Sequence, residues 1–247
     1  RVGLVAPLSA AARAVADRLA DGAALRRARV HPVQVLSALR TYARGQGVRG
    51  RHAWHPVPQV VDALDAAFYL AFGAVEPSGR RTLLALDVSG SMGAAVQGLD
   101  SLSCREASAA MALVTAATEP RHRFVAFTTG LSPLGVSPRQ RLDDVVHRVS
   151  RLPFGGTDCA LPMREAAKHG WEVDVFVVYT DSETWAGEVH PSQALRMYRE
   201  RTGIPAKLVV VGMASNGFTL ADPDDAGMLD VVGFDAAAPQ LIGDFAR

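Results

Sequence analysis

Residues 82–93, with the sequence TLLALDVSGSMG, decide the fold of this chain. A near-continuous apolar run is typical of a strand in a parallel sheet covered on both faces, and Asp87 is the last residue of this one. The glycines that follow allow a turn tight enough to aim Ser89 and Ser91 in one direction. Ligands of open α/β sheets bind at the carboxyl ends of the strands, so this turn is a candidate site.

Similar short apolar runs follow, and helical segments separate them. The spacing predicts strands at residues 82–87, 123–128, 174–180, 206–212 and 229–234, with a weaker strand at 131–136 as an antiparallel edge. Helices are expected from Ser103, whose hydroxyl can cap a helix with Glu106, and near residues 142–150, 158–168, 191–201 and 239–245. This alternation predicts a doubly wound α/β domain with a mostly parallel sheet.

The first part of the chain has a different pattern. Apolar residues there keep helical spacing, as Val60, Leu64 and Phe68 do, and His31-Pro32 is typical of a helix start. The turn-forming sequence EPSG at 76–79 separates this part from the strands. We therefore predict a small α-helical segment at residues 1–78 and an α/β domain at residues 79–247.

The composition is that of an ordinary folded protein, with 247 residues of which 49% are apolar and 21% charged. No apolar run approaches the ~20 residues of a membrane span, and no secretory leader is visible. Cys104 and Cys159 are too few for a disulfide framework or a structural zinc site, which favours a reducing, cytoplasmic setting. Because the chain begins with Arg1, we expect it to be a piece of something longer.

The charge is distributed unevenly. Residues 1–81 hold 12 Arg against 5 Asp and Glu, a net +7, and the rest carries −6. A basic segment could face a polyanion, or both charges could belong to ordinary solvated faces. Possible RNA contacts in the basic segment are Arg26, Arg27, Arg29, Arg40, Arg44, Arg49 and Arg51. Trp54 could stack on a base or anchor the helical segment against the α/β domain.

Three loops at strand ends offer hydroxyls and carboxylates. They are residues 87–91, residues 153–158 and residues 180–184. Oxygen ligands suit a hard cation such as Mg²⁺. Ser89, Ser91 and Asp158 could instead simply cap helices and turns, but three such loops at one end of a sheet favour a site.

The pattern Asp87-x-Ser89-x-Ser91, with Thr157 in a later loop and Asp181 at a strand end, resembles the metal-ion-dependent adhesion site of von Willebrand factor A domains. The resemblance implies a six-stranded sheet of order 3-2-1-4-5-6 with an antiparallel edge strand. It also implies that Ser89, Ser91 and Thr157 bind the metal directly or through water, while Asp87 and Asp181 hold its waters. The sixth position is left for an acidic group from a protein partner.

Longer runs resemble one family. They include GGTDCALPM at 155–163, TDSETWAG at 180–187 and SNGFT at 215–219, and they look like the carboxyl-terminal half of the Ro autoantigen family, in its bacterial branch. Members join a ring of helical repeats, the TROVE module, to an A domain, so residues 1–78 resemble the end of that module. The resemblance implies binding of Y RNA and misfolded noncoding RNA, and work with an exoribonuclease.

Taken together, these features predict a metal-dependent protein-interaction module of a Ro-type ribonucleoprotein in small-RNA quality control, processing or decay. Glu183 and Trp185, beside Asp181, are expected at the rim where a partner binds. The chain is predicted not to be an enzyme, since position 89 lacks the second Asp of a haloacid-dehalogenase-type phosphatase. A Mg²⁺-dependent phosphohydrolase and direct RNA binding by the basic segment remain alternatives. Residues 222–225 (DPDD) could form a turn or bind a second cation.

Overall fold

The computed structural model describes residues 5–48, 52–153, 155–181, 186–214 and 220–247. The chain divides into two compact units. One comprises Arg1–Glu76 with Asp100–Leu102, and the other comprises Pro77–Leu99 with Ser103–Arg247.

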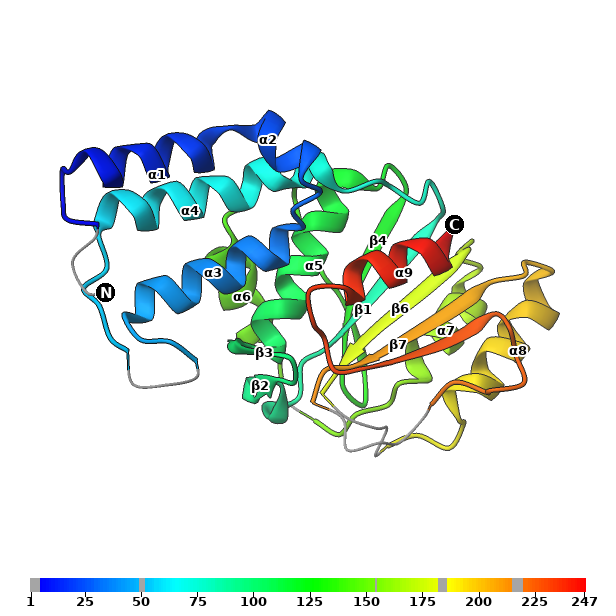
Figure 1. The fold of residues 1–247 in the computed structure, drawn as a ribbon. Coiled ribbons are helices and arrows are strands. Elements are labelled where there is room, and N and C mark those ends of the chain that lie inside the picture. The colour runs from blue at the N-terminus through cyan, green and yellow to red at the C-terminus, as the bar shows by residue number, and fades with distance from the viewer. Residues whose placement is uncertain (1–4, 49–51, 154, 182–185, 215–219) are drawn as a thin grey trace. The chain divides into compact units, whose positions relative to one another are not determined.

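The first unit is helical (Figure 1). In this unit α4 packs against both α1 and α3. The His31 side chain caps α3 by accepting a hydrogen bond from Val33 N, and Pro32 occupies the first turn, as the His-Pro pair predicts. The helices are α1 (Ala10–Ala20), α2 (Gly22–Arg27), α3 (Pro32–Arg44), α4 (Pro58–Leu70) and the 3₁₀-helix η1 (Ala71–Ala74).

The second unit is built on a six-stranded sheet of order β5-β4-β1-β6-β7-β8. Only β5 is antiparallel to its neighbour, so the order 3-2-1-4-5-6 and the antiparallel edge are confirmed. The strands are β1 (Thr82–Asp87), β4 (His122–Phe127), β5 (Leu131–Pro133), β6 (Val175–Thr180), β7 (Lys207–Gly212) and β8 (Met228–Val232). Every residue of β1 and β6 is buried, as central parallel strands require.

Helices cover both faces of this sheet (Figure 1). Side chains of α7 and α8, among them Met163, Ala166 and Leu195, share a core with Phe176 and Leu208 from the strands. The nearly fully buried α5 packs against β1 and β4. The helices of this unit are α5 (Cys104–Thr118), α6 (Leu142–Ser150), α7 (Leu161–His169), α8 (Pro191–Thr202) and α9 (Ala238–Ala246).

Two local features differ from the expectation. A short hairpin of β2 (Ala95–Val96) and β3 (Leu99–Ser103) precedes α5, where no strand was predicted. Furthermore, α7 begins at Leu161, three residues later than expected, because the Asp158 carboxylate accepts a hydrogen bond from Ala160 N and closes a turn first. Within the described ranges, no helix is long and apolar enough to cross a bilayer.

Candidate metal centre

Asp87 lies at the carboxyl end of the central strand β1 and its side chain is inaccessible to solvent. Its Oδ1 accepts a hydrogen bond from Ser89 N at 2.7 Å. Its Oδ2 accepts from Thr157 Oγ1 at 3.2 Å and from Thr180 Oγ1 at 2.9 Å. These three donors come from separate segments, so the buried carboxylate joins β1, the loop before α7 and the end of β6.

The two serine hydroxyls beside Asp87 face one another. Ser89 Oγ and Ser91 Oγ are 3.1 Å apart. Adjacent ligands of an octahedral Mg²⁺ with bonds of ~2.1 Å are separated by about 3 Å, so this spacing fits a shared cation. Ser89 precedes the 3₁₀-helix η2 (Gly90–Gly93), but its side chain makes no capping hydrogen bond. The alternative that Ser89 serves as a helix cap therefore has no support.

Thr157 is held in place by its backbone as well as by its hydroxyl. Ala186 N donates to Thr157 O at 3.0 Å, and Asp158 N donates to Thr128 O at 3.1 Å. A hydroxyl that gives its proton to a carboxylate presents its oxygen as an acceptor, which is the role of a cation ligand. Thr157 is buried, whereas Ser91 is exposed, so the side of the site at Ser91 opens to solvent.

Asp181 follows Thr180 at the end of β6 and is partly exposed. Burial is the main cause that raises the pKa of Asp87; hydrogen bonds from Ser89 and Thr180 oppose this, and the charge of Asp181 adds to it. Burial, with the charges of Asp181 and Asp87, also raises the pKa of the Cys104 thiol to about 12. Two carboxylates thus act on one poorly solvated region, which favours a cation there.

The donor set consists mainly of hydroxyls. Among the residues that the structure describes, no group of three or more His, Cys, Asp or Glu is placed to hold a metal ion. The oxygen atoms of Ser89, Ser91 and Thr157, with the carboxylates of Asp87 and Asp181, fit a hard cation better than a zinc-type centre.

Three residues near the site were not predicted to belong to it. Thr180 donates to Asp87, and the Arg105 guanidinium of α5 donates to Ser89 O at 3.1 Å. The third is Gly187, with φ +90°, where a Cβ would lie 2.6 Å from the Asp158 carboxyl carbon. The position of Thr180, directly before Asp181 at a predicted strand end, was a signal that could have identified it.

Other predicted residues lie elsewhere or outside the described ranges. The rim residues Glu183 and Trp185, and the possible RNA contacts Arg49 and Arg51, fall outside the described residues. Of the other possible RNA contacts, Arg26, Arg27, Arg29 and Arg44 are exposed and Arg40 is half-buried.

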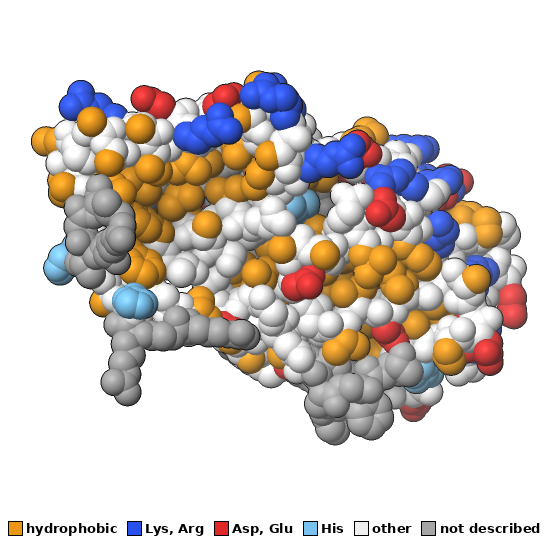
Figure 2. Space-filling view, viewed as in Figure 1, with side chains coloured by type: hydrophobic (Ala, Val, Ile, Leu, Met, Phe, Trp, Pro, Cys, Tyr) orange, Lys and Arg blue, Asp and Glu red, His pale blue; other side chains and the backbone are white. Residues whose placement is uncertain are grey.

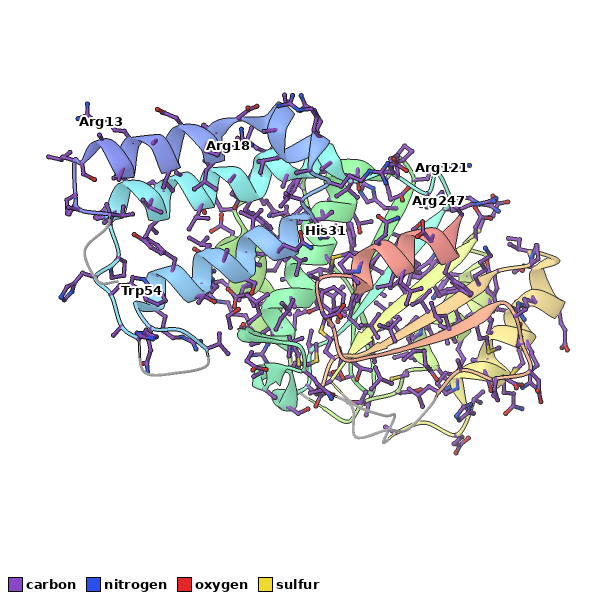
Figure 3. All side chains as sticks on the ribbon, viewed as in Figure 1. Arg13, Arg18, His31, Trp54, Arg121 and Arg247 are labelled. Atoms are coloured by element: carbon purple, nitrogen blue, oxygen red, sulfur yellow. The ribbon has the colours of Figure 1, made fainter. Side chains whose placement is uncertain are left out.

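Trp54 packs within the helical unit (Figure 3). Its Nε1 donates to Tyr42 O at 2.9 Å, and its ring stacks on the Tyr42 ring with 6.2 Å between centroids. The indole therefore has a packing partner in α3.

The acidic segment 222–225 forms a turn. Asp224 N donates to Asp222 Oδ1 at 3.0 Å. Asp222 pairs with Arg196, and Asp225 pairs with Arg199, each at 2.5 Å. Because arginines already neutralise two of its carboxylates, this segment is occupied by structural ion pairs.

The sheet order and the cluster at the end of β1 define a von Willebrand factor A-type domain. Residues 81–246 match the family described as the Ro60 vWA domain, and the chain belongs to that family.

Relatives support this membership. The chain is 51% identical over 249 residues to "RNA-binding protein RO60" of Deinococcus radiodurans, covering all of this chain and 47% of the relative. It is 45% identical to "RNA-binding protein RO60" of Caenorhabditis elegans, covering 94% of this chain and 36% of the relative. The crystal structure of the Deinococcus radiodurans RO (RSR) protein superposes with a TM-score of 0.94 at 51% identity, covering 99% of this chain and 50% of that one. The chain thus spans half or less of these relatives.

Proposed function

We propose that this chain is the metal-dependent protein-interaction module of a Ro-type RNA-binding protein. Two relatives that match nearly the whole chain carry the name RNA-binding protein. The observation that carries the metal-dependent part is that Ser89 and Thr157 both contact the buried Asp87 carboxylate, while the Ser91 hydroxyl lies beside that of Ser89.

In this proposal Ser89, Ser91 and Thr157 hold a Mg²⁺ ion, and Asp87 and Asp181 orient its waters. When bound, the cation supplies a positive centre that accepts a carboxylate from a protein partner. The exposed Ser91 side is the direction from which a partner can approach. Thr180 and the backbone of Ser89 fix the Asp87 carboxylate, so the donors are positioned before the cation arrives.

Isothermal titration of the chain with Mg²⁺ tests the site. The double variant Ser89→Ala/Ser91→Ala should lose measurable Mg²⁺ binding while its circular dichroism spectrum stays unchanged. A matched double variant, Ser132→Ala/Ser137→Ala, removes two hydroxyls from β5 and the segment after it and should bind Mg²⁺ normally. Unaltered affinity in the first variant would contradict the site.

The wider role follows from the family resemblance. We propose that the whole protein carries Y RNA and misfolded noncoding RNA in the cytoplasm, and that it works with an exoribonuclease in RNA quality control, processing or decay. Purification of the full-length protein from its own cells, with identification of the bound RNA and proteins, tests this role. Recovery of neither RNA nor a ribonuclease would contradict it.

Direct RNA binding by the helical unit is a second candidate, favoured by the exposure of Arg26, Arg27, Arg29 and Arg44. Phosphate contacts from these side chains would make RNA binding weaken steeply as salt rises. The expectation that the chain is not an enzyme has its own test. Mg²⁺-dependent hydrolysis of a phosphate ester that Asp87→Ala abolishes would instead support a phosphohydrolase.

A further inference from the structure

Arginines collect at the starts of the strands, the end of the sheet opposite to Asp87. Arg80 and Arg81 precede β1, Arg121 precedes β4, and Arg123 is the second residue of β4. Arg80, Arg121 and Arg123 are exposed. Figure 2 shows Lys and Arg side chains gathered where the chain enters β1, beside the end of α9, and Figure 3 places Arg121 and Arg247 there. We call Arg80, Arg121 and Arg123 the amino-end cluster.

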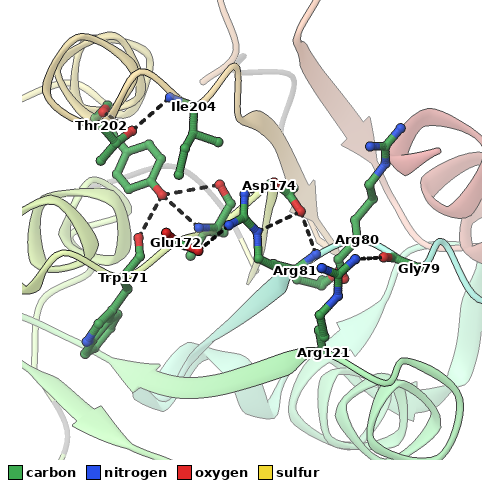
Figure 4. A network of polar contacts seen from close by, with 12 residues as sticks. Gly79, Arg80, Arg81, Arg121, Trp171, Glu172, Asp174, Thr202 and Ile204 are labelled. Carbon is green, nitrogen blue, oxygen red and sulfur yellow. Dashed lines mark hydrogen bonds and ion pairs between the residues drawn. The ribbon is translucent and has the colours of Figure 1, made fainter.

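The neighbouring carboxylates are already engaged. Asp174 and Glu172 each lie 2.5 Å from the Arg81 guanidinium (Figure 4). The Glu119 carboxylate accepts hydrogen bonds from Ser78 N and Gly79 N. Within the described part of the chain, no residue of the amino-end cluster forms an ion pair with a carboxylate. Hydrogen bonds from Arg81 lower the pKa of the Asp174 carboxyl, and the charge of Arg121 also acts on this carboxyl and lowers its pKa further. Four arginines thus face the three carboxylates Glu119, Glu172 and Asp174, which leaves a net positive charge at this end.

Each guanidinium of the cluster is held by a contact that fixes the position of its side chain. Arg121 Nη2 donates to Gly79 O at 2.5 Å and Arg80 Nη2 to Arg247 O at 2.7 Å. The Arg123 guanidinium lies 4.2 Å from the centre of the Trp171 ring. Side chains fixed in this way lose less rotational freedom when they bind a ligand.

We propose that the amino-end cluster binds phosphate groups of single-stranded RNA. This inference rests on the proposed function, namely that the protein carries RNA, and adds a contact surface on the A-type unit. A guanidinium presents a planar set of N–H donors that matches phosphate oxygens, and several exposed guanidiniums at one surface favour a polyanion. Because the cluster lies at the opposite end of the sheet from the metal centre, RNA and a protein partner could bind together.

The test compares RNA affinities in EDTA, so that the metal centre plays no part. Anisotropy of a labelled single-stranded oligouridylate gives the affinity of the chain between about 50 and 200 mM salt. Each phosphate contact contributes about 0.7 to the slope of log affinity against log salt. Arg121→Gln/Arg123→Gln should therefore lower that slope by about 1.4. The control Arg139→Gln/Arg151→Gln changes the charge equally at two other exposed sites and should alter the slope far less.

A conservative variant guards against loss of folding. Arg121→Lys/Arg123→Lys keeps the charge, so it should retain most of the salt slope. An unchanged slope in the Gln variant, an equal loss in the control, or no RNA binding by the wild-type chain would overturn the inference. Binding of an oligoglutamate would also overturn the inference, if its affinity is at least that of the RNA and if the Arg121→Gln/Arg123→Gln variant weakens it equally. Purification of the full-length protein with its RNA reports separately on the proposed function, because RNA can still be recovered there if this cluster does not bind it. Magnesium titration of the same variants should be unchanged, since the metal centre lies at the other end of the sheet.

Discussion

Thr180 and Thr157 donate their hydroxyl protons to the same oxygen of Asp87, so the buried carboxylate depends on two side chains from different segments. Replacing Thr180 by Val keeps the shape and removes one donor. A hydrogen bond to a charged group contributes about 1.5–3 kcal/mol, so we expect Thr180→Val to lower the unfolding free energy by roughly this amount. Urea denaturation in EDTA measures the loss.

Thr180→Ser is the matched control because it keeps the hydroxyl. It should recover most of the stability lost in the Val variant, apart from the small cost of one methyl group. If the Ser and Val variants were equally destabilised, the methyl group rather than the hydrogen bond would be the important feature of Thr180.

His31 makes the stability of the helical unit depend on pH. Burial lowers the pKa of His31 to about 4 from an ordinary value of 6.5, and its Nδ1 accepts the Val33 N–H that begins α3. Because the pKa of His31 is lower in the folded state, the unfolded chain takes up a proton first as the pH falls below ~6.5. The stability that the neutral His31 contributes is therefore fully present above pH ~6.5 and is lost as the pH falls towards about 4. The loss is at most about 3–4 kcal/mol.

His31→Asn separates this effect from other acid effects. Asparagine caps a helix without taking up a proton in this range. The stability difference between His31→Asn and the wild type should therefore shift in favour of the variant between pH 7.5 and pH 5, as urea titrations at both values would show. A difference independent of pH would contradict the role of His31.

At the scale of elements, Gly187 allows the segment after β6 to approach the start of α7. A Cβ at this position would lie 2.6 Å from the Asp158 carboxyl carbon, and Asp158 follows Thr157. Gly187→Ala should therefore displace the Thr157 loop and weaken Mg²⁺ binding as well as stability. Calorimetric Mg²⁺ titration and urea denaturation measure the two effects.

Gly170 provides the comparison. It also has a positive φ, +64°, but a Cβ there meets nothing within 4 Å. Gly170→Ala should cost only about 1–2 kcal/mol of left-handed backbone strain and should leave Mg²⁺ binding unchanged. Equal Mg²⁺ affinities in the two variants would show that the Asp158 approach does not position Thr157.

The sequence could predict those elements whose residues follow a local pattern, but not those that depend on distant contacts. Apolar runs such as that of β1 predicted the five parallel strands to within about two residues, because central parallel strands must be buried on both faces. The antiparallel edge strand β5 ends at Pro133, three residues before its predicted end. The β2–β3 hairpin was missed because it is short and depends on distant anchors: Gln97 N donates to Met213 O, and Phe234 N donates to Gln97 O.

The candidate site also has a part that local spacing predicts and a part that depends on contacts between loops. Asp87, Ser89 and Ser91 lie in one turn, so their spacing predicted their proximity, and the structure also brings Thr157 to them. The contact between Gly187 and Asp158 depends on how two loops approach in space, which no local spacing encodes. Binding of a metal by these residues stays a prediction.

At the scale of the whole molecule, a cation bound at the carboxyl end of the sheet should stabilise only the unit that contains it. At a Mg²⁺ concentration about 100 times the Kd, binding adds about 2.7 kcal/mol, so openings of the site should become roughly 100-fold rarer. Hydrogen exchange followed by mass spectrometry should show added protection at β1, β6 and the start of α7. Equal protection in α1 and α4 would contradict a localised site.

The strands of this sheet also separate charge along their length. Carboxylates such as Asp87 and Asp181 lie at one end, and the amino-end cluster lies at the other. A protein unit with such an electric dipole moment experiences a torque in the field of a distant polyanion. The unit would therefore rotate during the encounter until the amino ends of its strands face the polyanion. The opposite end, with Ser89 and Ser91, would then face the solvent and be accessible to a second molecule.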